Sequence, residues 1–528
     1  MKWRALIVLS AAQFLMVLDQ AVMNVSISQL VEDFDTTVTV IQGVITFYAL
    51  VMAALMITGG KLGDIWGRRR AFLIGLLIYA AGSALTAASQ SVPQLLLGWS
   101  VLEGIGAALV LPALVALIAS SYSGPDRAVA YGVIGGVAGA GIAVGPILGG
   151  WVTTEFTWRY VFVGEVILAL AIVALVGWLT EGERPTAPRI DWMGVLLSSL
   201  GLGLLVYGIL QASSWGWIAN VDSPATPFGL ALTPFVVGAG AILLGLFVRW
   251  SQRRETRGKD ALFRLALLDV LPLRGGLQML TIQGVILMGA FFAIPLYLQV
   301  VQGLNALETG LRMLPVSVAM FVMSFVGARL SASFTPRKIV RSGLVVLLIA
   351  VIVLAATILP DLRGFAFGLS MTLLGVGMGL LASQLGNVVQ SSVAERDRSE
   401  AGGLQYTAQQ LGNALGTALV GAIVISALGS ALINTIQSDE RISAEVSADI
   451  GVELSTGVSF VPTSEAEAAL AETGLTPEEQ SAVLEAYEEG QLFALRLGLV
   501  VAAGIVVVAL FLVRRIPDQS FEEMATSV

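Results

Sequence analysis

Apolar residues occur along this chain in long blocks separated by short polar connections. Fourteen of these blocks are long enough to cross a hydrocarbon layer of about 30 Å as a helix. They cover residues 5–27, 43–60, 71–89, 94–117, 131–153, 159–179, 192–211, 228–248, 276–300, 310–332, 339–359, 365–387, 404–430 and 492–513. The pattern predicts an all-α integral membrane protein with fourteen spans, because apolar runs of this length are typical of transmembrane helices.

Composition indicates lipid as the solvent and narrows the function. Hydrophobic residues make up 56% of the 528 positions and charged residues only 12%, which would leave a soluble chain with large exposed apolar patches. The chain has no His and no Cys, which excludes imidazole and thiol nucleophiles, disulfides and His/Cys metal sites. It also contains no G-x-x-x-x-G-K-[ST] phosphate loop. We therefore expect a transporter driven by an ion gradient, unless a separate ATPase subunit is bound, rather than an enzyme, and we expect no cofactor.

Basic residues cluster in alternate connections, at 68–70, 249–264, 337–341 and 514–515. The positive-inside rule therefore predicts that these connections and both termini are cytoplasmic. The apolar run after Met1 imitates a signal peptide, but Asp19 and Asn24 stand where a cleavage site would be, so we interpret it as the first span. We expect a multi-pass protein of the bacterial inner membrane.

The net charge of −8 comes from one segment. Residues 434–491 hold thirteen Asp and Glu against Arg441 alone, so the remainder is slightly basic and gives no indication of nucleic-acid binding. This acidic loop falls on the outer side. Residues 476–479 (TPEE) are typical of a capped helix start, which predicts a small helical cap over the outer mouth, with a solvated loop as the alternative. Contact of the loop with lipid or an accessory protein stays open.

The chain contains an internal repeat. Residues 59–70 (GGKLGDIWGRRR) and 327–338 (GARLSASFTPRK) share the spacing of Gly, basic, Leu, aromatic and paired basic residues. Each copy follows the second span of a six-span block, so spans 1–6 and 9–14 are expected to form two parallel halves. The expected domains are a first bundle at 1–180, two inserted spans with a cytoplasmic linker at 181–271, a second bundle at 272–513 and a tail at 514–528.

The first copy of the repeat resembles the G-x-L-a-D-r-x-G-r-[RK] loop of the major facilitator superfamily. Fourteen spans, with residues 145–150 (GPILGG) in span 5, are similar to the drug:proton antiporter branch of that family. Further matches are Leu18-Asp19, Asn24-Val25, Trp158-Arg159, residues 191–194 (DWMG) and residues 295–299 (PLYLQ). The resemblance implies the major facilitator fold, with two six-helix bundles plus two inserted helices.

The sequence departs from this family at several positions. Ser100 replaces an intramembrane Arg of the family's span 4, and Glu103 replaces a Gln, so a proton relay built around that Arg cannot be transferred to this chain. Glu165, near the start of span 6, stands where the branch often has Asn. In the second copy of the repeat, Ala332 replaces the acidic residue that is Asp64 in the first copy.

Three carboxylates stand clear of the membrane interfaces: Asp19, Glu103 and Glu165. An ionised carboxylate inside hydrocarbon is costly, so it tends to be protonated or paired, which suits a proton carrier. Counting ~1.5 Å per residue places all three roughly 10 to 15 Å deep in the outer half of the membrane. In the resembled fold spans 1 and 4 line the central cavity and span 6 is peripheral, which favours Glu103 and Asp19. For each of the three, simple packing with a hydrogen bond to a neighbour is the alternative.

The resemblance implies a gate and an exporter element. The loop at Gly60, Asp64, Gly67, Arg68 and Arg69 would be the gate, in which Asp64 meets cationic groups or helix ends near span 11 or span 4; a topology anchor is the alternative. Span 5 carries the exporter element at Gly145, Pro146, Gly149 and Gly150, with a bend at Pro146; ordinary helix packing is the alternative. Polar and aromatic side chains of the second half are candidates for substrate lining or for interhelical hydrogen bonds: Gln283, Phe291, Phe292, Tyr297, Gln405 and Tyr406.

Together these features predict a proton-coupled antiporter that exports amphipathic or cationic small molecules by alternating access, as in multidrug efflux and antibiotic resistance. The expected partners are that substrate, protons and the lipid bilayer. An exporter or flippase of a lipid or lipid conjugate is the alternative within transport, because a cavity with few charges also suits acyl chains. A sensor or scaffold that does not transport is the alternative from another class.

Overall fold

The computed structural model describes residues 3–36, 38–179, 190–218, 223–262, 264–394, 397–439, 441–442, 460–461, 463–471 and 475–519. The α-helices are α1 (Arg4–Val25), α2 (Ile27–Asp33), α3 (Val38–Trp66), α4 (Arg68–Ala87), α5 (Val92–Leu95), α6 (Gly104–Ser121), α7 (Gly124–Glu155), α8 (Arg159–Leu175), α9 (Trp192–Trp215), α10 (Thr233–Glu255), α11 (Leu271–Leu296), α12 (Ala306–Leu330), α13 (Pro336–Thr357), α14 (Gly364–Ser391), α15 (Arg398–Ser438), α17 (Thr463–Ala471) and α18 (Pro477–Leu512). Two π-helical segments, η1 (Leu96–Glu103) and η5 (Tyr297–Val301), continue α5 and α11, and short 3-10 turns are η2 (Val176–Trp178), η3 (Pro227–Gly229), η4 (Leu265–Asp269) and η7 (Val513–Arg515).

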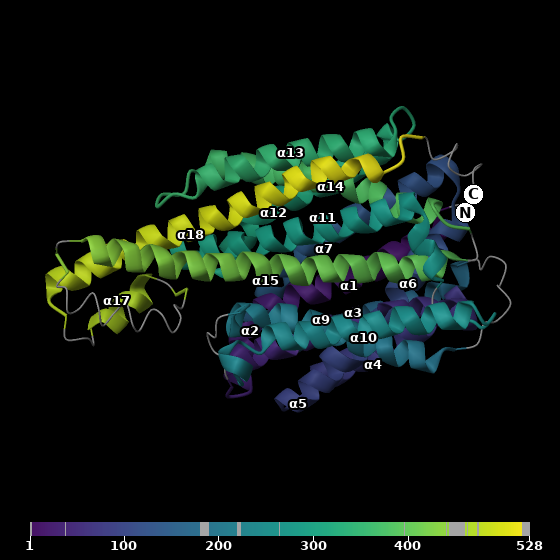
Figure 1. Ribbon diagram of the computed structural model, residues 1–528, viewed down its shortest axis with the longest axis horizontal. Coiled ribbons are helices and arrows are strands. Elements are labelled where there is room, and N and C mark those ends of the chain that lie inside the picture. The colour runs from purple at the N-terminus through teal and green to yellow at the C-terminus, as the bar shows by residue number, and fades with distance from the viewer. Residues whose placement is uncertain are drawn as a thin grey trace.

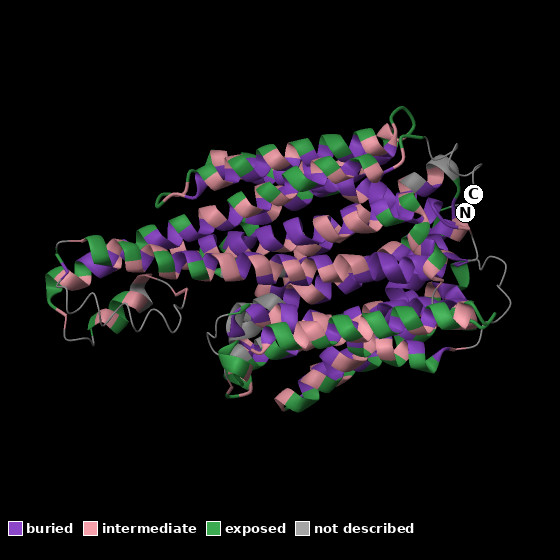
Figure 2. Ribbon diagram, viewed as in Figure 1, coloured by how far each residue is buried: buried purple, intermediate pink, exposed green. Residues whose placement is uncertain are grey.

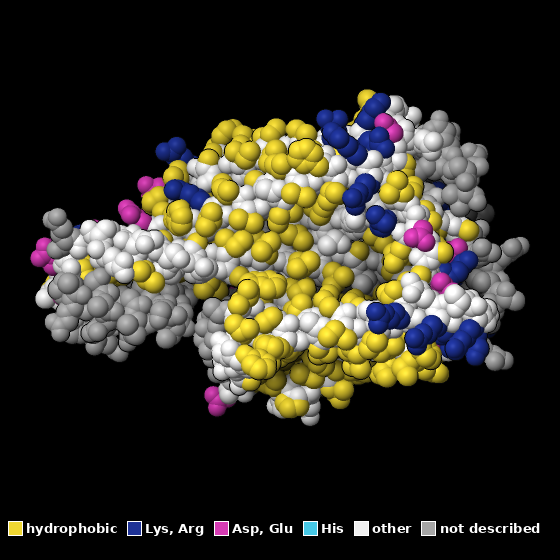
Figure 3. Space-filling view, viewed as in Figure 1, with side chains coloured by type: hydrophobic (Ala, Val, Ile, Leu, Met, Phe, Trp, Pro, Cys, Tyr) yellow, Lys and Arg dark blue, Asp and Glu magenta, His cyan; other side chains and the backbone are white. Residues whose placement is uncertain are grey.

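Fourteen helical segments among the described residues are long and apolar enough to cross a membrane, which confirms the all-α, fourteen-span prediction. Because α5, η1 and α6 run on without a break, they form one span, and α11 continues into η5 in the same way. The helices lie nearly parallel in Figure 1, and Figure 3 shows hydrophobic side chains covering the middle of the molecule between polar ends. This is the surface that a lipid bilayer requires.

Spans 13 and 14 extend well beyond their apolar cores. α15 continues through polar sequence to Ser438. The hydroxyl groups of Ser430 and Ser438 donate to backbone carbonyls one turn earlier in the helix. α18 begins in the acidic loop with the expected capping pair, since Thr476 and Glu479 each satisfy a backbone N–H of the other. The predicted helix start is therefore confirmed, but this helix runs on unbroken as span 14 and is not a separate cap. Residues 443–459 of the loop lie outside the described residues.

Two helix bundles account for twelve of the spans. The core of the first is built from α1, α3, α4, α6, α7 and α8, and the core of the second from α11 to α15 and α18. Span 7 (α9) packs where the bundles meet, with Val206 and Ile209 against Ala53 of α3 and Ala414 of α15. Span 8 (α10) covers α9, which it approaches so closely that a Cβ at Gly240 would stand 2.6 Å from the Leu205 nitrogen. The division into domains at residues 180 and 271 stays a prediction.

The two ends of the molecule differ in charge. Figure 3 shows Lys and Arg gathered mainly at the end where both chain termini lie, which we call the basic end. The opposite end, where α15, α17 and α18 project in Figure 1, carries acidic side chains, and we call it the acidic end. Near the basic end the ribbon in Figure 2 is coloured largely as buried, and the halves touch there, since a Cβ at Gly402 of α15 would lie 2.7 Å from Val115 of α6.

Candidate functional site

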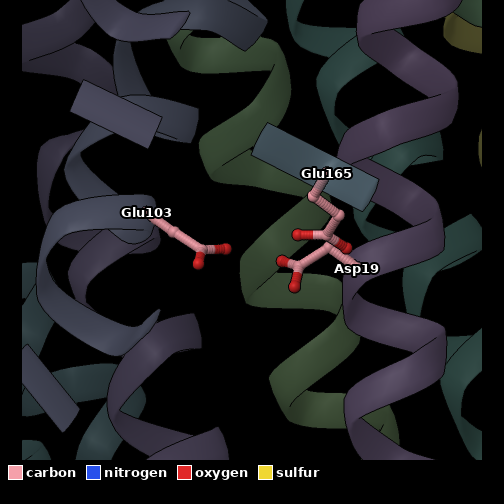
Figure 4. A group of neighbouring side chains, drawn as sticks. All are labelled: Asp19, Glu103 and Glu165. Carbon is pink, nitrogen blue, oxygen red and sulfur yellow. The ribbon is translucent and has the colours of Figure 1, made fainter. Parts of the chain in front are cut away.

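The structure brings the three intramembrane carboxylates together. Asp19 lies on α1, Glu103 is the last residue of η1, and Glu165 lies on α8. One oxygen from each lies within 4.8 Å of the others, and the side chains converge from two sides in Figure 4. All three are buried, with exposed fractions of 0%, 0% and 2%. Carboxylates that are 146 residues apart in sequence therefore share one site inside the first bundle.

Neutral donors hold this carboxylate cluster in place. The Trp99 indole N–H donates to Asp19 Oδ1 at 2.7 Å. Tyr79 and Ser83, both on α4, donate to Glu165 Oε2 at 3.0 and 3.3 Å. Thr86, on the same helix, donates to Glu103 Oε1 at 3.3 Å. The second oxygen of each carboxyl group has no hydrogen-bond partner, so every member keeps one oxygen available to a proton or a ligand.

The side chains that the structure describes do not supply a positive charge to balance the cluster. Within the described part of the chain, no Lys or Arg forms an ion pair with any of the three carboxylates. Two ionised carboxylates at this spacing repel by roughly 3 to 4 kcal/mol at an effective dielectric constant of about 20. Ionising all three together in a buried site is therefore unfavourable. Protons can neutralise the cluster, and oxygen ligands at this spacing also suit a hard metal cation.

Glycines and the π-helical turn position Glu103. A Cβ at Gly82 would lie 2.7 Å from Glu103 Cγ, and a Cβ at Gly98 would lie 2.6 Å from Thr86 Oγ1, so both positions need glycine for α4 and η1 to touch. The π-helix places one extra residue in the turns before Glu103, a device common at functional sites. Tyr48 stacks on Trp99 with ring centroids 4.5 Å apart, which fixes the indole that faces Asp19.

Glu165 is more central than the sequence indicated. Span 6 does lie at the periphery, because Ile167 and Leu170 of α8 are exposed. The face that carries Glu165 nevertheless points inward, and one of its carboxylate oxygens lies within 4.8 Å of an oxygen from each of the other two. Ser100, where the resembled family has Arg, donates to the Val44 carbonyl at 2.7 Å and contributes to helix packing.

A second group of polar residues joins the halves at the basic end. Lys61 Nζ contacts Glu400 Oε1 at 2.7 Å, and the Arg68 Nε–H donates to Ser399 Oγ at 3.0 Å. Asp64 is buried among these residues and interacts electrostatically with Arg68, Lys61 and Glu400. Since Lys61 to Arg68 belong to the first bundle and Ser399 and Glu400 begin α15 in the second, this is a closure between the halves.

The gate loop was expected to meet cationic groups or helix ends near span 11 or span 4. In the structure its polar contacts with the other half are instead with the N-terminal turn of α15, which is span 13. The reason is packing: a Cβ at Gly60 would lie 2.5 Å from the Ser399 carbonyl oxygen, so α3 and α15 touch backbone to backbone. Within the gate, Gly67 takes a positive φ of 92° just before α4, and Arg69 is half-buried beside it.

Further inter-half contacts reinforce this closure. Arg127 at the start of α7 donates through Nε to Asn387 Oδ1 at 3.0 Å and through Nη2 to Ser391 Oγ at 2.7 Å. In the other direction, Arg398 of α15 donates to the Ala119 carbonyl at 2.8 Å. Lys61, Arg127 and Ser399 were not expected as site residues. Lys61 and Arg127 carried the signal of a basic residue at the end of an apolar span, which topology alone also explains, and Ser399 carried no charge that would single it out.

The small residues of span 5 serve two interfaces. A Cβ at Gly145 would lie 2.3 Å from the Ala21 Cβ of α1, and one at Gly149 would lie 3.0 Å from Val22. The other face meets α12, where a Cβ at Gly132 would stand 2.7 Å from Ala328. Span 5 therefore holds α1 on one side and the second bundle on the other. Gly150 is half-buried, and the side chain of Pro146 lies outside the described residues.

The candidate lining residues separate into two groups. Tyr297 is fully buried in the second bundle and donates to the Leu359 carbonyl at 2.8 Å, so it does not line an open space in this conformation. Phe291 and Phe292 pack on the core of that bundle, and Gln283 is buried. Tyr406 is different, because its hydroxyl donates to Gln13 of α1 at 3.1 Å across the interface, and Gln405 lies beside it. Only this last pair lies where the halves meet.

The fold and these sites define a multi-pass membrane transport protein rather than an enzyme. The chain belongs to the Major Facilitator Superfamily, whose family model matches residues 9–417. Two solved structures share the fold. The human organic anion transporter MFSD10 has a TM-score of 0.59 and 14% identity, and the match covers 97% of this chain and 99% of that one. The proton:xylose symporter XylE has a TM-score of 0.56 and 14% identity, and the match covers 100% of this chain and 98% of that one.

Several relatives are exporters or resistance proteins by name. The chain is 31% identical to a probable actinorhodin transporter of Streptomyces coelicolor, over 78% of this chain and 70% of the relative. It is 31% identical to the puromycin resistance protein pur8 of Streptomyces alboniger, over 78% and 80%. It is 29% identical to the multidrug efflux pump LfrA of Mycolicibacterium smegmatis, over 78% of both chains. The family expected from the sequence is therefore confirmed, and these three relatives are named as a transporter, a resistance protein and a multidrug efflux pump.

Proposed function

We propose that this protein exports amphipathic, drug-like small molecules in exchange for protons, and that Asp19, Glu103 and Glu165 form the proton-coupling site. The observation that carries the proposal is the buried cluster of three carboxylates. Among the described residues, its hydrogen-bond donors are neutral and one oxygen of each member has no partner. Such a group is stable in the membrane when it holds protons and is ready to lose them when water or a cationic substrate arrives. The names of the relatives support drugs as the substrate class.

The orientation follows from the charges at the two ends. With the basic end in the cytoplasm of a bacterial inner membrane, both termini are cytoplasmic, and the closure around Lys61 and Glu400 blocks the cytoplasmic side. The carboxylate cluster then lies in the first bundle between that closure and the outer face. In alternating access, breaking the closure would carry the protonated cluster toward the cytoplasm, where proton release drives the next cycle.

The test uses purified protein in proteoliposomes with an imposed pH gradient, ethidium as a cationic probe and chloramphenicol as a neutral one. We predict that Glu103→Gln lowers gradient-driven accumulation by about tenfold or more, because an amide cannot release a proton. Exchange of labelled for unlabelled probe without a gradient should remain. Glu32→Gln is the matched control, since Glu32 is an exposed carboxylate on α2.

Three results would contradict the proposal. Normal accumulation by Glu103→Gln would remove Glu103 from coupling. If a Na⁺ or K⁺ gradient replaced the pH gradient with equal effect, the cluster would be a metal-cation site rather than a proton site. Movement of a fluorescent phospholipid instead of either probe would favour the alternative of a lipid exporter.

A further inference from the structure

The linker between the inserted helices and the second bundle takes part in the closure at the basic end. It leaves α10 after Glu255 and reaches η4 at Leu265. Within it, the Arg264 guanidinium forms an ion pair with Asp397, and the Arg264 backbone N–H donates to Glu400 Oε2 at 3.1 Å. The other oxygen of Glu400 holds Lys61 of the first bundle. Three separate parts of the chain therefore meet at the first turn of α15.

An apolar contact of the same linker spans both halves. Leu262 is fully buried in a small core with Ile57 of α3 and Leu404 of α15. Ile57 belongs to the first bundle and Leu404 to the second, so the linker side chain fills the space where these helices converge. Burying a leucine completely contributes about 2 kcal/mol, which makes this contact comparable with the charged one.

Charge explains why the linker is held at this point. Asp397 and Glu400 lie at the N-terminus of α15, where the helix dipole favours negative charge. Both side chains are nearly buried, with exposed fractions of 7% and 6%. Two acidic groups in such a place require two cations, of which Lys61 supplies one and Arg264 the other.

The linker is in turn fixed to the inserted helices. The Leu265 N–H donates to Glu255 Oε1 at 2.8 Å, and Arg254 Nε donates to the Asp260 carbonyl at 2.7 Å. Asp191, which caps α9, accepts from the Trp250 indole of α10 at 3.0 Å. The position of Arg264 is therefore coupled to span 8 and, through Asp191, to span 7, which packs where the bundles meet.

We propose that the linker of residues 256–264 is a latch on the closed basic end, and that Arg264 is its positioning residue. Arg264 acts through Asp397 and Glu400, and it is not a member of the carboxylate cluster. Opening of the basic end requires that the linker release both helices, so the inserted pair sets the balance between the closed and open conformations. The inference takes from the proposed function only that the halves move relative to each other.

The test measures that movement directly, without substrate or gradient. The chain contains no Cys, so Arg70→Cys and Arg341→Cys introduce the only two labelling sites, one exposed position per half at the basic end. Spin-label distances between them report closed and open populations. We expect Arg264→Ala to raise the ratio of open to closed protein about fivefold, the effect of losing one partly exposed ion pair, and Arg264→Lys to restore most of the closed population.

The matched control is Arg257→Ala, which removes an exposed positive charge from the same linker and should leave the ratio unchanged. The double variant Arg264→Ala with Asp397→Asn should open no further than the more open of the two single variants. The reason is that each single change already removes the same ion pair between Arg264 and Asp397. Unchanged distances in Arg264→Ala, additive effects in the double variant, or an equal shift in Arg257→Ala would overturn the proposal. If Arg264→Ala gives too little protein, Arg264→Gln, which keeps the chain length, makes the same comparison with Arg264→Lys. Because no transport is measured, loss of proton coupling would not affect this result.

Discussion

At the residue scale, the carboxylate cluster shows what a sequence can and cannot reveal. Asp19, Glu103 and Glu165 could all be found because acidic residues inside apolar spans are rare and costly. Their mutual distance could not, since it depends on which face of α8 turns inward and on the extra residue that the π-helical turn inserts before Glu103. The donors Trp99 and Tyr79 were missed for a simpler reason: aromatic residues in a membrane span usually pack against apolar neighbours.

The geometry makes a specific prediction for Glu165. We expect Glu165→Gln to reduce gradient-driven ethidium accumulation by about tenfold, as for Glu103→Gln, because the amide removes one exchangeable proton from a cluster whose members interact. Protein yield should be kept, since Gln can still accept the hydrogen bonds from Tyr79 and Ser83. Vesicle transport and a folding measurement by size-exclusion chromatography check both parts. Accumulation at the parental level would make Glu165 a packing residue.

At the element scale, existence and order of the spans were predictable, whereas two helix lengths and the contacts between helices were not. Hydropathy locates apolar cores, but α15 and α18 continue as helices through polar sequence that carries no membrane signal. The gate loop could be recognised from its spacing, yet its partner could not, because the contact between α3 and α15 depends on the angle between two bundles. In the sequence, the only sign of the close contact at Gly60 is the glycine itself, and small residues are common in membrane helices for other reasons.

This close approach can be tested with neighbouring glycines on α3. A Cβ at Gly60 would lie 2.5 Å from the Ser399 carbonyl oxygen, whereas the nearest atom to a Cβ at Gly63 is 3.8 Å away. We predict that Gly60→Ala forces α3 and α15 apart and favours the open basic end by about tenfold, the effect of 1 to 3 kcal/mol of overpacking. Gly63→Ala should behave like the parent. The spin-label pair at positions 70 and 341 measures both, and equal distances in the two variants would argue against a backbone contact.

At the scale of the whole molecule, the fold class was fixed by composition and by the internal repeat, and the family by a few motifs. The asymmetry between the ends was also visible in the sequence, because basic residues alternate between connections and acidic residues concentrate in one loop. What sequence could not supply is the conformational state. In alternating access the halves touch at the basic end in one conformation and at the acidic end in the other. The same sequence is compatible with both, so the sequence does not indicate which one is adopted.

The proposed orientation gives a further prediction for the intact cell. Because the chain has no Cys, single variants Arg70→Cys and Glu478→Cys provide one labelling site each, at the basic and the acidic end. A membrane-impermeant maleimide should label position 478 in whole cells and position 70 only after the membrane is opened. Both variants react in detergent if they are folded and exposed, which serves as the control. The reverse pattern in whole cells would place the termini outside.

The length of α15 has a mechanical consequence. Its 41 residues form a rod of about 60 Å, twice the thickness of the hydrocarbon layer, and it makes the gate contacts with its first turn. A tilt of ~10° about that turn moves the far tip by roughly 10 Å, so a small rotation at the gate becomes a large displacement of the projecting end of the helix. In the proposed orientation this end faces the medium. We therefore expect a binder that holds the projecting end to restrain the gate without entering the first bundle.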